Sequence, residues 1–358
     1  MLGSSTIANA QLISVFDQWD KDRNGKLSRE ELPANLRKNF DRVDINKDGW
    51  ISRQEDANIR SQQVQNRRVV LPKGVKKTSN IDYAGTGKAR QKLDLYHPEG
   101  LEEGEKLPLV CWFHGGGWAV GDKSYVGKIL PFITSDEYIC ASIGFRLSNE
   151  VQWPGQLHDC KAAIRFLRAN AEKYQIDPER IVVVGSSSGG HIAMMVGLCN
   201  DDPKLEGSVG GALDQGSTIN CVINFFGPSD LIKISERFKL FNLDSITNPV
   251  EKLIGGPLPD YNKQTKAASP LNQVSKDDCP VMIVHGTDDP FVPFEQSVEL
   301  NKKLKQEGVE TQFVTIKRGG HGQNFPYQEV NQSIKAFVDY HLLNLGDKPQ
   351  DLTLEVTK

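Results

Sequence analysis

The segment GSSSG at residues 185–189 places Ser187 between two glycines, one two positions before it and one two positions after it. It follows the apolar run 180–184 and leads into the apolar stretch 188–199. This spacing predicts a sharp turn from strand to helix, where the backbone passes too close for a Cβ at either glycine. At such a turn the serine hydroxyl lies at a helix N-terminus, where the helix dipole stabilises developing negative charge. We therefore predict that Ser187 is the nucleophile of a serine hydrolase.

A second glycine-rich segment, HGGGW at residues 114–118, follows the apolar run 107–113. Taken alone it is compatible with a plain turn, but its position upstream of the serine turn favours an oxyanion-binding loop. The predicted donors are the backbone N–H groups of Gly116, Gly117 and Ser188. Losing one such donor typically costs ~3–4 kcal/mol of transition-state stabilisation.

The base that activates the serine is expected downstream, since hydrolases with this turn follow the chain order Ser, acid, His. Three histidines qualify by position: His285, His321 and His341. His285 directly follows the apolar run 280–284, which leaves no room for an acid on a separate strand before it. His341 lies in the last helical stretch, where a surface role is expected. His321 lies in a glycine-rich loop after another apolar run, and we predict that it is the base.

The acid is expected after the strand that precedes the His321 loop, where Asp288 and Asp289 compete. Asp289 precedes Pro-Phe-Val-Pro, a turn that directs its carboxylate toward His321, whereas Asp288 is expected to brace the turn. In the predicted mechanism Ser187 attacks an ester carbonyl, and His321 takes the serine proton and returns it to the leaving alcohol. Asp289 fixes the imidazole tautomer and stabilises the imidazolium.

Residues 20–31 and 44–55 both match the calcium-loop pattern Asp-x-[Asp/Asn]-x-[Asp/Asn]-Gly that ends in Glu. Leu27 and Ile51 occupy the apolar position through which two such loops pair by a short β-bridge. The predicted ligands of the first loop are Asp20, Asp22, Asn24, Glu31 and the carbonyl of Lys26. Those of the second loop are Asp44, Asn46, Asp48, Glu55 and the carbonyl of Trp50.

The two loops predict an EF-hand pair over residues 1–60 that binds up to two calcium ions. No methionine lies between Leu2 and Ala193, which argues against a soft, calmodulin-like target groove. The predicted role of calcium is therefore structural. A calcium-operated gate over the active site is the alternative.

Beyond residue 79 the sequence alternates apolar runs with amphipathic stretches, which predicts a mostly parallel sheet flanked by helices, the α/β class. The predicted strands are 90–97, 107–113, 137–145, 180–184, 219–226, 280–284 and 311–316. The predicted helices are 155–174, 188–199, 294–307 and 326–344.

The expected domain plan is a small all-α calcium-binding module, then a polar linker at 61–78 and a catalytic domain at 79–346. A polar tail at 347–358 is expected to be frayed. Within the catalytic domain, residues 228–270 interrupt the strand–helix alternation and are predicted to form a lid-like excursion. We expect the substrate pocket to be shaped by Trp118, Phe238 and Phe241.

The composition limits the partners of this chain. Its 358 residues carry a net charge of -3, so there is no basic field for nucleic acid and no polybasic membrane anchor. No apolar stretch approaches the ~18 residues of a spanning helix. Six cysteines are too few for a disulfide scaffold, and neither a CxxC pair nor a zinc-spaced Cys/His cluster occurs. The start lacks a signal-peptide layout, yet paired calcium loops suit external calcium and favour an extracytoplasmic location.

Residues 80–345 resemble the α/β-hydrolase carboxylesterases of the hormone-sensitive-lipase and bacterial feruloyl-esterase-like groups. The resemblance lies in CWFHGGGWAVGDK, FRLS, the stretch from QLHDC to GSSSGGHIA, FGPSDL, LIGGP, and VMIVHGTDDPFVPFEQS through GGHG. It implies Ser187, Asp289 and His321 as the triad. It also implies short-acyl or aromatic-acyl ester substrates, derived from plant polymers or acylated sugars. Phe145 departs from the pattern, since such enzymes often have Tyr there.

Two other functions are compatible with the sequence. A serine peptidase of the prolyl-oligopeptidase type shares the serine turn and the triad order, although this chain has no room for the propeller domain of those enzymes. A calcium-dependent binding protein on an inactive hydrolase scaffold is the second alternative. It is disfavoured because both the serine and the histidine are present.

Overall fold

The structure is a computed structural model, and it describes residues 16, 19–22, 24–32, 37, 40–44, 46–52, 55–56, 71, 73–199, 202–240 and 248–355. The chain divides into two compact units, residues 1–70 and residues 71–358. Each unit is described by itself.

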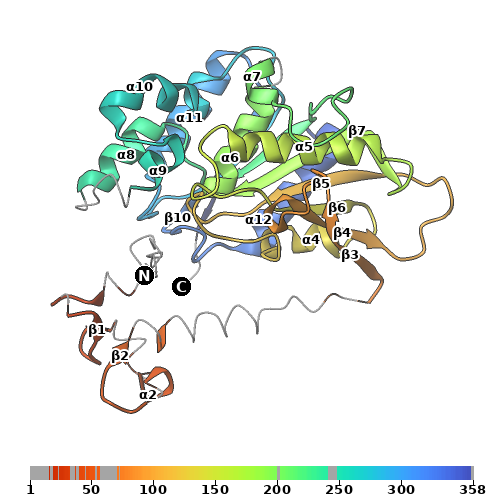
Figure 1. Cartoon of the computed structure of the whole chain (residues 1–358). Helices are drawn as coiled ribbons and strands as arrows, with labels where there is room; N and C mark the ends of the chain where they lie inside the picture. The colour runs from red at the N-terminus through yellow and green to blue at the C-terminus, as the bar shows by residue number, and fades with distance from the viewer. Residues whose placement is uncertain are drawn as a thin grey trace, which may run out of the picture. The chain divides into compact units, whose positions relative to one another are not determined.

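The larger unit is built on a nine-stranded sheet with the strand order β11-β10-β9-β8-β7-β5-β6-β4-β3 (Figure 1). The strands from β11 through β6 are parallel to their neighbours, and β4 pairs antiparallel with both β6 and β3. Their bounds are β3 Val75–Asp82, β4 Lys92–Pro98, β5 Leu107–Phe113, β6 Ile139–Ile143, β7 Ile176–Ser186, β8 Cys221–Phe225, β9 Val281–Gly286, β10 Thr311–Lys317 and β11 Leu352–Glu355. This arrangement confirms the predicted α/β class.

Helices cover both faces of the sheet, with α5, α6 and α11 on one side and α4 and α12 on the other (Figure 1). Their bounds are α4 Leu130–Ile133, α5 Gly155–Ala169, α6 Ser188–Leu198, α11 Phe294–Gln306 and α12 Tyr327–Val338. A short helix, α7 Pro203–Glu206, follows α6, and a π-helical turn, η5 Asp339–Leu343, extends α12. Covered on both faces, strands such as β6 and β8 are buried throughout, which is why they are continuous apolar runs in the sequence.

The predicted excursion at 228–270 is largely helical in its described part. It contains α8 Leu231–Leu240, α9 Pro249–Ile254 and α10 Leu258–Ala267. Asn248 caps α9, because its side-chain oxygen accepts from the backbone N–H of Val250 at 3.0 Å. Val250 and Leu253 are fully buried and join the main core. The predicted pocket residue Phe241 lies outside the described residues.

Two edge strands reach beyond the boundaries expected from the sequence. β3 begins at Val75, inside the predicted linker 61–78, and β11 lies inside the predicted tail 347–358. Within the described part of the chain, each has one neighbouring strand and is largely exposed, so neither carries the apolar run by which the inner strands were predicted. The described part of the tail is therefore ordered by pairing with β10 rather than frayed.

The smaller unit contains two short strands, β1 Lys26–Leu27 and β2 Ile51–Ser52, which pair antiparallel with Leu27 opposite Ile51. This is the predicted β-bridge between the two loops. A short helix, α2 Phe40–Val43, lies between them in the chain. Among the described residues of this unit, a small apolar core contains Phe16, Leu27, Leu32, Phe40 and Ile51.

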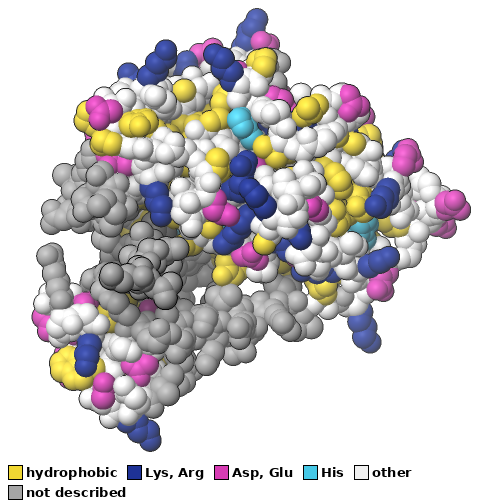
Figure 2. Space-filling model, in the orientation of Figure 1, with side chains coloured by type: hydrophobic (Ala, Val, Ile, Leu, Met, Phe, Trp, Pro, Cys, Tyr) yellow, Lys and Arg dark blue, Asp and Glu magenta, His cyan; other side chains and the backbone are white. Residues whose placement is uncertain are grey.

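Acidic and basic side chains are interspersed over the face of the molecule seen in Figure 2. None of the helices in the described ranges has the length and apolar character that crossing a bilayer requires. All six cysteines are unpaired thiols.

Candidate active site

Ser187 lies between the end of β7 and the start of α6, as predicted, in a strained backbone conformation with φ 55° and ψ −125°. A non-glycine residue pays about 1–3 kcal/mol for such a conformation, and it persists only where the surrounding structure enforces it. Here the Ser187 N–H donates to the carbonyl of Phe225 at 2.9 Å, which ties the turn to the neighbouring strand β8.

The two flanking glycines are required by close backbone contacts. A Cβ on Gly185 would lie 2.1 Å from the carbonyl oxygen of Gly189, and one on Gly189 would lie 2.1 Å from that of Phe113. Both separations are far below any allowed contact. The spacing GxSxG therefore has a steric cause in this fold, and the turn brings the backbone of Gly189 against the end of β5.

The glycine-rich loop 114–118 lies beside this turn because β5 and β7 are neighbours with Phe113 opposite Gly185. A Cβ on Gly115 would lie 3.3 Å from the Cβ of Ser187. Gly116 has φ 131°, and Gly117 has φ 58°. The backbone N–H groups of both glycines lack an acceptor within the described part of the chain, and Ser188 begins a helix whose first N–H groups have no intrahelical partner.

Trp118, predicted to line the pocket, lies in the core with 2% of its surface exposed. Its Nε1 donates to Nδ1 of His191 at 3.1 Å, and Nε2 of His191 lies 2.7 Å from the carbonyl of Ala268. Burial lowers the pKa of His191 to about 4, so the ring is neutral. Its Nδ1 accepts from Trp118 while its Nε2 donates to the carbonyl of Ala268. Trp118 therefore anchors the glycine loop to helix α6 and to the end of α10. Phe238, on α8, is partly buried against the main core.

His321 and Asp289 meet at the same edge of the sheet. Nδ1 of His321 lies 2.7 Å from Oδ2 of Asp289. Their loops follow β10 and β9, and they are joined by the bond from the Asp288 N–H to the carbonyl of Gly319 at 2.9 Å. The side chain of Asp288 is exposed and accepts from the hydroxyl of Thr287 at 2.9 Å, so it braces the turn.

Asp289 is buried, and several donors converge on it. Oδ1 accepts from the N–H of Phe291 at 2.8 Å and of Val292 at 2.9 Å, while Nε2 of His285 lies 3.2 Å from Oδ2. Burial alone raises the pKa of this carboxyl, but hydrogen bonds from His285 and His321, followed by the charge of His321, outweigh it and hold the pKa well below its usual range. Because an ionised carboxylate only accepts, Nδ1 of His321 carries a proton, and Nε2 is the ring nitrogen that can exchange a proton with another group.

Three residues of this site were not predicted from the sequence. The imidazole of His321 packs against Phe226 at 4.4 Å and against Phe291 at 5.4 Å between ring centroids. Phe226 directly follows Phe225, whose carbonyl accepts from the Ser187 N–H. Phe225 and Phe226 therefore connect the serine turn to the loop that carries His321. His285 was considered as a base, but it supports Asp289 instead. Phe226 lies in the motif FFGPSD, and His285 and Phe291 lie in HGTDDPFVP. Nothing in these motifs indicates which loop the three side chains contact.

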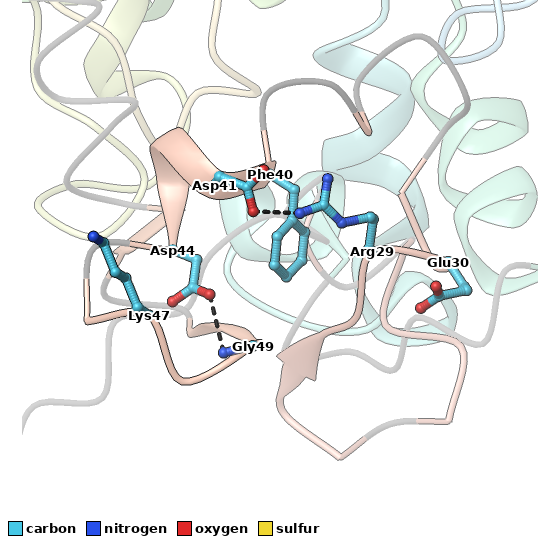
Figure 3. A pocket seen from close by; sticks show the side chains of 7 residues that line it. All are labelled: Arg29, Glu30, Phe40, Asp41, Asp44, Lys47 and Gly49. Carbon is cyan, nitrogen blue, oxygen red and sulfur yellow. Dashed lines mark hydrogen bonds and ion pairs between the residues drawn. The ribbon is translucent and has the colours of Figure 1, made fainter.

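The two acidic loops of the smaller unit show the same hydrogen-bond geometry. In the first, Asp20 accepts from the N–H groups of Asn24 at 3.0 Å and Gly25 at 2.9 Å. In the second, Asp44 accepts from those of Asp48 at 3.1 Å and Gly49 at 3.0 Å, as Figure 3 shows in part around a hollow of about 610 Å³.

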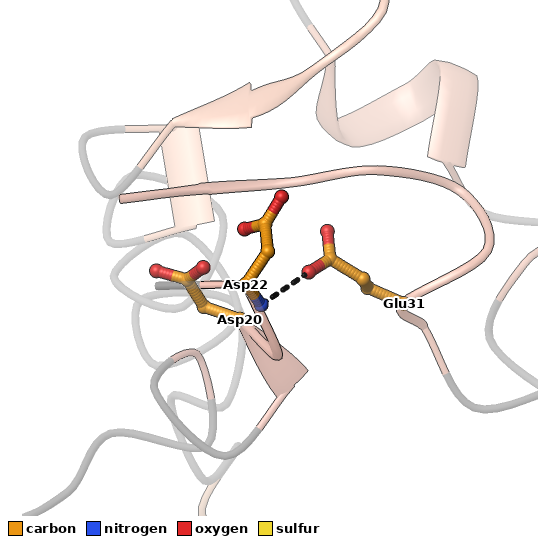
Figure 4. Close-up of side chains that lie close together, drawn as sticks. All are labelled: Asp20, Asp22 and Glu31. Carbon is orange, nitrogen blue, oxygen red and sulfur yellow. Dashed lines mark hydrogen bonds between the residues drawn. The ribbon is translucent and has the colours of Figure 1, made fainter. Parts of the chain in front are cut away.

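The closing glutamates of the two loops also correspond. Glu31 accepts from the N–H of Ser28 at 2.7 Å and Glu55 from the N–H of Ser52 at 2.9 Å. Oxygen atoms of Asp20, Asp22 and Glu31 lie within 4.8 Å of one another (Figure 4). Such a set of carboxylate oxygens fits the donor chemistry that Ca²⁺ prefers.

Comparison with known families gives three matches within the chain. The sequence profile of the BD-FAE family matches residues 93–304. That of the Abhydrolase_4 family, described as TAP-like protein, matches residues 260–353. An EF-hand domain profile matches residues 11–39, which include the first acidic loop.

Individual proteins agree with these matches. Esterase LipQ of Mycobacterium tuberculosis is 28% identical over 237 residues, which are 65% of this chain and 54% of LipQ. A truncated carbohydrate esterase from gut microbiota is 31% identical with a TM-score of 0.63, covering 74% of this chain and 95% of that one. Esterase B from Lactobacillus rhamnosis shares the fold at 21% identity and a TM-score of 0.67, covering 81% and 94%. The chain spans about half the length of the curated relatives that it matches first.

Proposed function

The chain belongs to the BD-FAE family, and from this premise we propose that it is a serine carboxylesterase whose acyl-enzyme forms on Ser187. The observation that carries the proposal is the contact of 2.7 Å between Nδ1 of His321 and Oδ2 of the buried Asp289, on the sheet edge that also bears the strained Ser187 turn. A serine is inert near neutral pH without such an oriented base.

In the proposed reaction Nε2 of His321 accepts the hydroxyl proton as the Ser187 oxygen attacks the ester carbonyl. The negative charge of the tetrahedral intermediate is stabilised by the N–H groups of Gly116, Gly117 and Ser188. His321 then protonates the leaving alkoxide as the ester C–O bond breaks. A water molecule, deprotonated by the same nitrogen, attacks the acyl-enzyme and releases the acid and free Ser187.

We propose acylated carbohydrates as the substrate class, with a short-acyl or aromatic-acyl group such as those on plant polymers. The support is the 31% identity to a truncated carbohydrate esterase, of which 95% is covered. We propose that the acyl group binds beside His321, where Phe291 packs against the imidazole and exposes 41% of its surface.

A panel of acetyl, butyryl, octanoyl and feruloyl esters, on p-nitrophenol and on sugars, tests this proposal. We expect turnover of short-acyl or feruloyl esters, loss of at least about 10³-fold in kcat for Ser187→Ala, and labelling of Ser187 by a fluorophosphonate. Hydrolysis that persists in Ser187→Ala would refute the mechanism. Faster cleavage of peptide anilides than of esters would assign the chain to the serine peptidases, and failure to label Ser187 would indicate an inactive scaffold.

We also infer that residues 1–60 bind up to two calcium ions and that the ions stabilise this unit. The inference is supported by the matching geometry of the two loops and by their β-bridge between Leu27 and Ile51. Asp20, Asp22, Asn24 and Glu31 would hold one ion with the Lys26 carbonyl, and Asp44, Asn46, Asp48 and Glu55 would hold the other with the Trp50 carbonyl. A bound ion would offset the repulsion between the gathered carboxylates.

Calorimetric titration with calcium tests this inference, with Glu31→Gln and Glu55→Gln each expected to remove one site. A dissociation constant of about 0.1–1 mM would suit the extracytoplasmic location that we propose, whereas a micromolar or tighter value would argue against it. EGTA should lower the melting temperature and leave the low-temperature esterase rate unchanged. A rate that falls with calcium removal while melting is unchanged would instead support a regulatory gate.

A further inference from the structure

We propose that Lys128 and Tyr327 are positioning residues for His321: Lys128 directs the Tyr327 hydroxyl onto the carbonyl of Gly322 and thereby holds the histidine loop in its working conformation. The inference rests on the proposed function, because it takes His321 to be the base. It concerns two side chains from distant parts of the chain, η3 Gly127–Ile129 and the first residue of α12.

The hydrogen bonds of this pair have a defined direction. The hydroxyl of Tyr327 donates to the carbonyl of Gly322 at 2.6 Å, and the ammonium of Lys128 donates to the same hydroxyl oxygen. An ammonium group has no lone pair, so the tyrosine oxygen must accept from it. The single proton of the hydroxyl then turns away from Lys128, toward the Gly322 carbonyl. Lys128 thus favours the orientation in which the hydroxyl proton points toward the Gly322 carbonyl rather than toward Lys128.

The surroundings of Lys128 are aromatic. Its Nζ lies 4.0 Å from the ring centroid of Tyr327 and 5.2–5.7 Å from those of Phe225, Phe226 and Phe325. No carboxylate in the described ranges forms an ion pair with it. Burial lowers the pKa of Lys128 to about 8. Among the described residues, the titratable group seen in contact with it is Tyr327, whose pKa burial raises to about 12. Burying part of a cation without a counter-charge costs free energy, and the four aromatic rings around Lys128 offset some of that cost.

The contacts of Lys128 and Tyr327 extend to Gly322, the residue next to His321. Gly322 has φ 82°, and a Cβ there would lie 3.4 Å from both the Lys128 Nζ and the Tyr327 Oη, and 3.2 Å from Cζ of Phe226. Phe226 in turn packs against the His321 imidazole. The loop itself contributes short internal bonds, from the Gly322 N–H to the Gly320 carbonyl at 2.8 Å and from Gly320 to Gln323 at 3.0 Å. The hydroxyl of Tyr327 therefore holds the loop at the residue adjacent to the base.

Kinetics on p-nitrophenyl acetate with the full chain test the proposal through Tyr327→Phe, Lys128→Met and the double variant. Each single change is expected to lower kcat about three- to tenfold with KM unchanged, the value of one hydrogen bond. The double variant should lose no more than Tyr327→Phe alone, because Lys128 acts through the hydroxyl. Lys173→Met is the matched control, since Lys173 also lies over a tyrosine ring, Tyr174 at 5.1 Å, beside the amino end of β7.

The pH profile gives a readout that a purely structural role would not change. Above pH about 8 the neutral Lys128 amine can accept the tyrosine proton, so wild-type kcat should fall on the alkaline side, and Lys128→Met should lack this fall. Circular dichroism and melting verify folding, and Lys128→Gln, which keeps an N–H donor without a charge, replaces Lys128→Met if the latter does not fold.

Wild-type kcat in either single variant, independent losses in the double variant, or an alkaline fall that survives without Lys128 would overturn the inference. Loss of activity in Ser187→Ala and in His321→Ala together with any of these results would refute only the positioning role. Activity retained in those two variants would instead refute the proposed function itself.

Discussion

His285 and His321 contact the same oxygen of one carboxylate. Nε2 of His285 lies 3.2 Å from Oδ2 of Asp289, and Nδ1 of His321 lies 2.7 Å from it. Nε2 of His285 also lies 3.0 Å from the carbonyl of Val292, and its Nδ1 lies 2.7 Å from the hydroxyl of Ser297. Since both partners of Nε2 only accept, this nitrogen carries a proton that it donates toward the Asp289 carboxylate and the Val292 carbonyl. His285 thus helps to hold Asp289 ionised and in place.

Replacing His285 by leucine should therefore destabilise the fold and also disturb the proposed catalytic pair Asp289 and His321. Leaving a buried carboxylate short of one donor costs about 1–3 kcal/mol of unfolding free energy, and we expect kcat to fall with it because Asp289 is freer to move away from His321. Urea unfolding and ester kinetics measure the two effects.

His158→Gln is the control for His285→Leu. His158 also contacts a backbone carbonyl, that of Lys204 at 2.8 Å, but it lies on α5 and is only half-buried. We expect little change in either quantity for this variant. A His285→Leu variant with wild-type kcat would contradict the supporting role.

The depressed pKa of Asp289 predicts how stability depends on pH. A carboxyl whose pKa is lower in the folded state stabilises that state fully above its unfolded pKa, near 3.8, and loses this contribution as pH falls through the folded value. The difference in unfolding free energy between wild type and Asp289→Asn should thus be constant from pH 7 to 5 and narrow below pH about 4. Denaturant titrations at each pH measure it. A difference that widened as pH fell would show that the folded pKa is raised instead.

Gly189→Ala should disrupt the serine turn. The new methyl group would lie 2.1 Å from the carbonyl oxygen of Phe113, so the backbone of α6 or β5 must move. We expect a loss of about 3 kcal/mol or more in unfolding free energy and a loss of fluorophosphonate labelling at Ser187. Gly211→Ala is the matched control, since a Cβ there meets nothing within 4 Å. Equal effects of the two substitutions would contradict the steric explanation.

Trp118→Phe should disturb the glycine-rich loop 114–118, the proposed oxyanion site, without removing any predicted donor. It leaves Nδ1 of the buried His191 without the indole N–H at 3.1 Å, at a cost of about 1–3 kcal/mol. Because Trp118 follows Gly117 directly, we expect kcat to fall while KM for a short ester changes little. Stopped-flow acylation and thermal melting measure these quantities. A change confined to KM would indicate that Trp118 contacts the substrate, as the sequence alone suggested.

Much of the site could be predicted because its motifs are local. The glycines around Ser187 and the acidic spacing of the two loops are requirements of the backbone within a few residues, so they appear as patterns in the sequence. The inner strands could be predicted from the sequence because burial on both faces demands a continuous apolar run. The edge strands β3 and β11 could not, since exposed strands have no such requirement.

The sequence by itself determined the α/β class, the order of the elements and the residues placed at the carboxyl ends of the strands. Only the tertiary structure decided that Trp118 turns into the core, that His285 supports Asp289, and that Lys128 meets Tyr327 199 residues further along the chain. Such contacts depend on which strands are neighbours and on how their loops cross the sheet edge. No residue spacing in the sequence records that order. β5 follows β4 in the chain, yet in the sheet β6 lies beside β4, and β5 lies between β6 and β7.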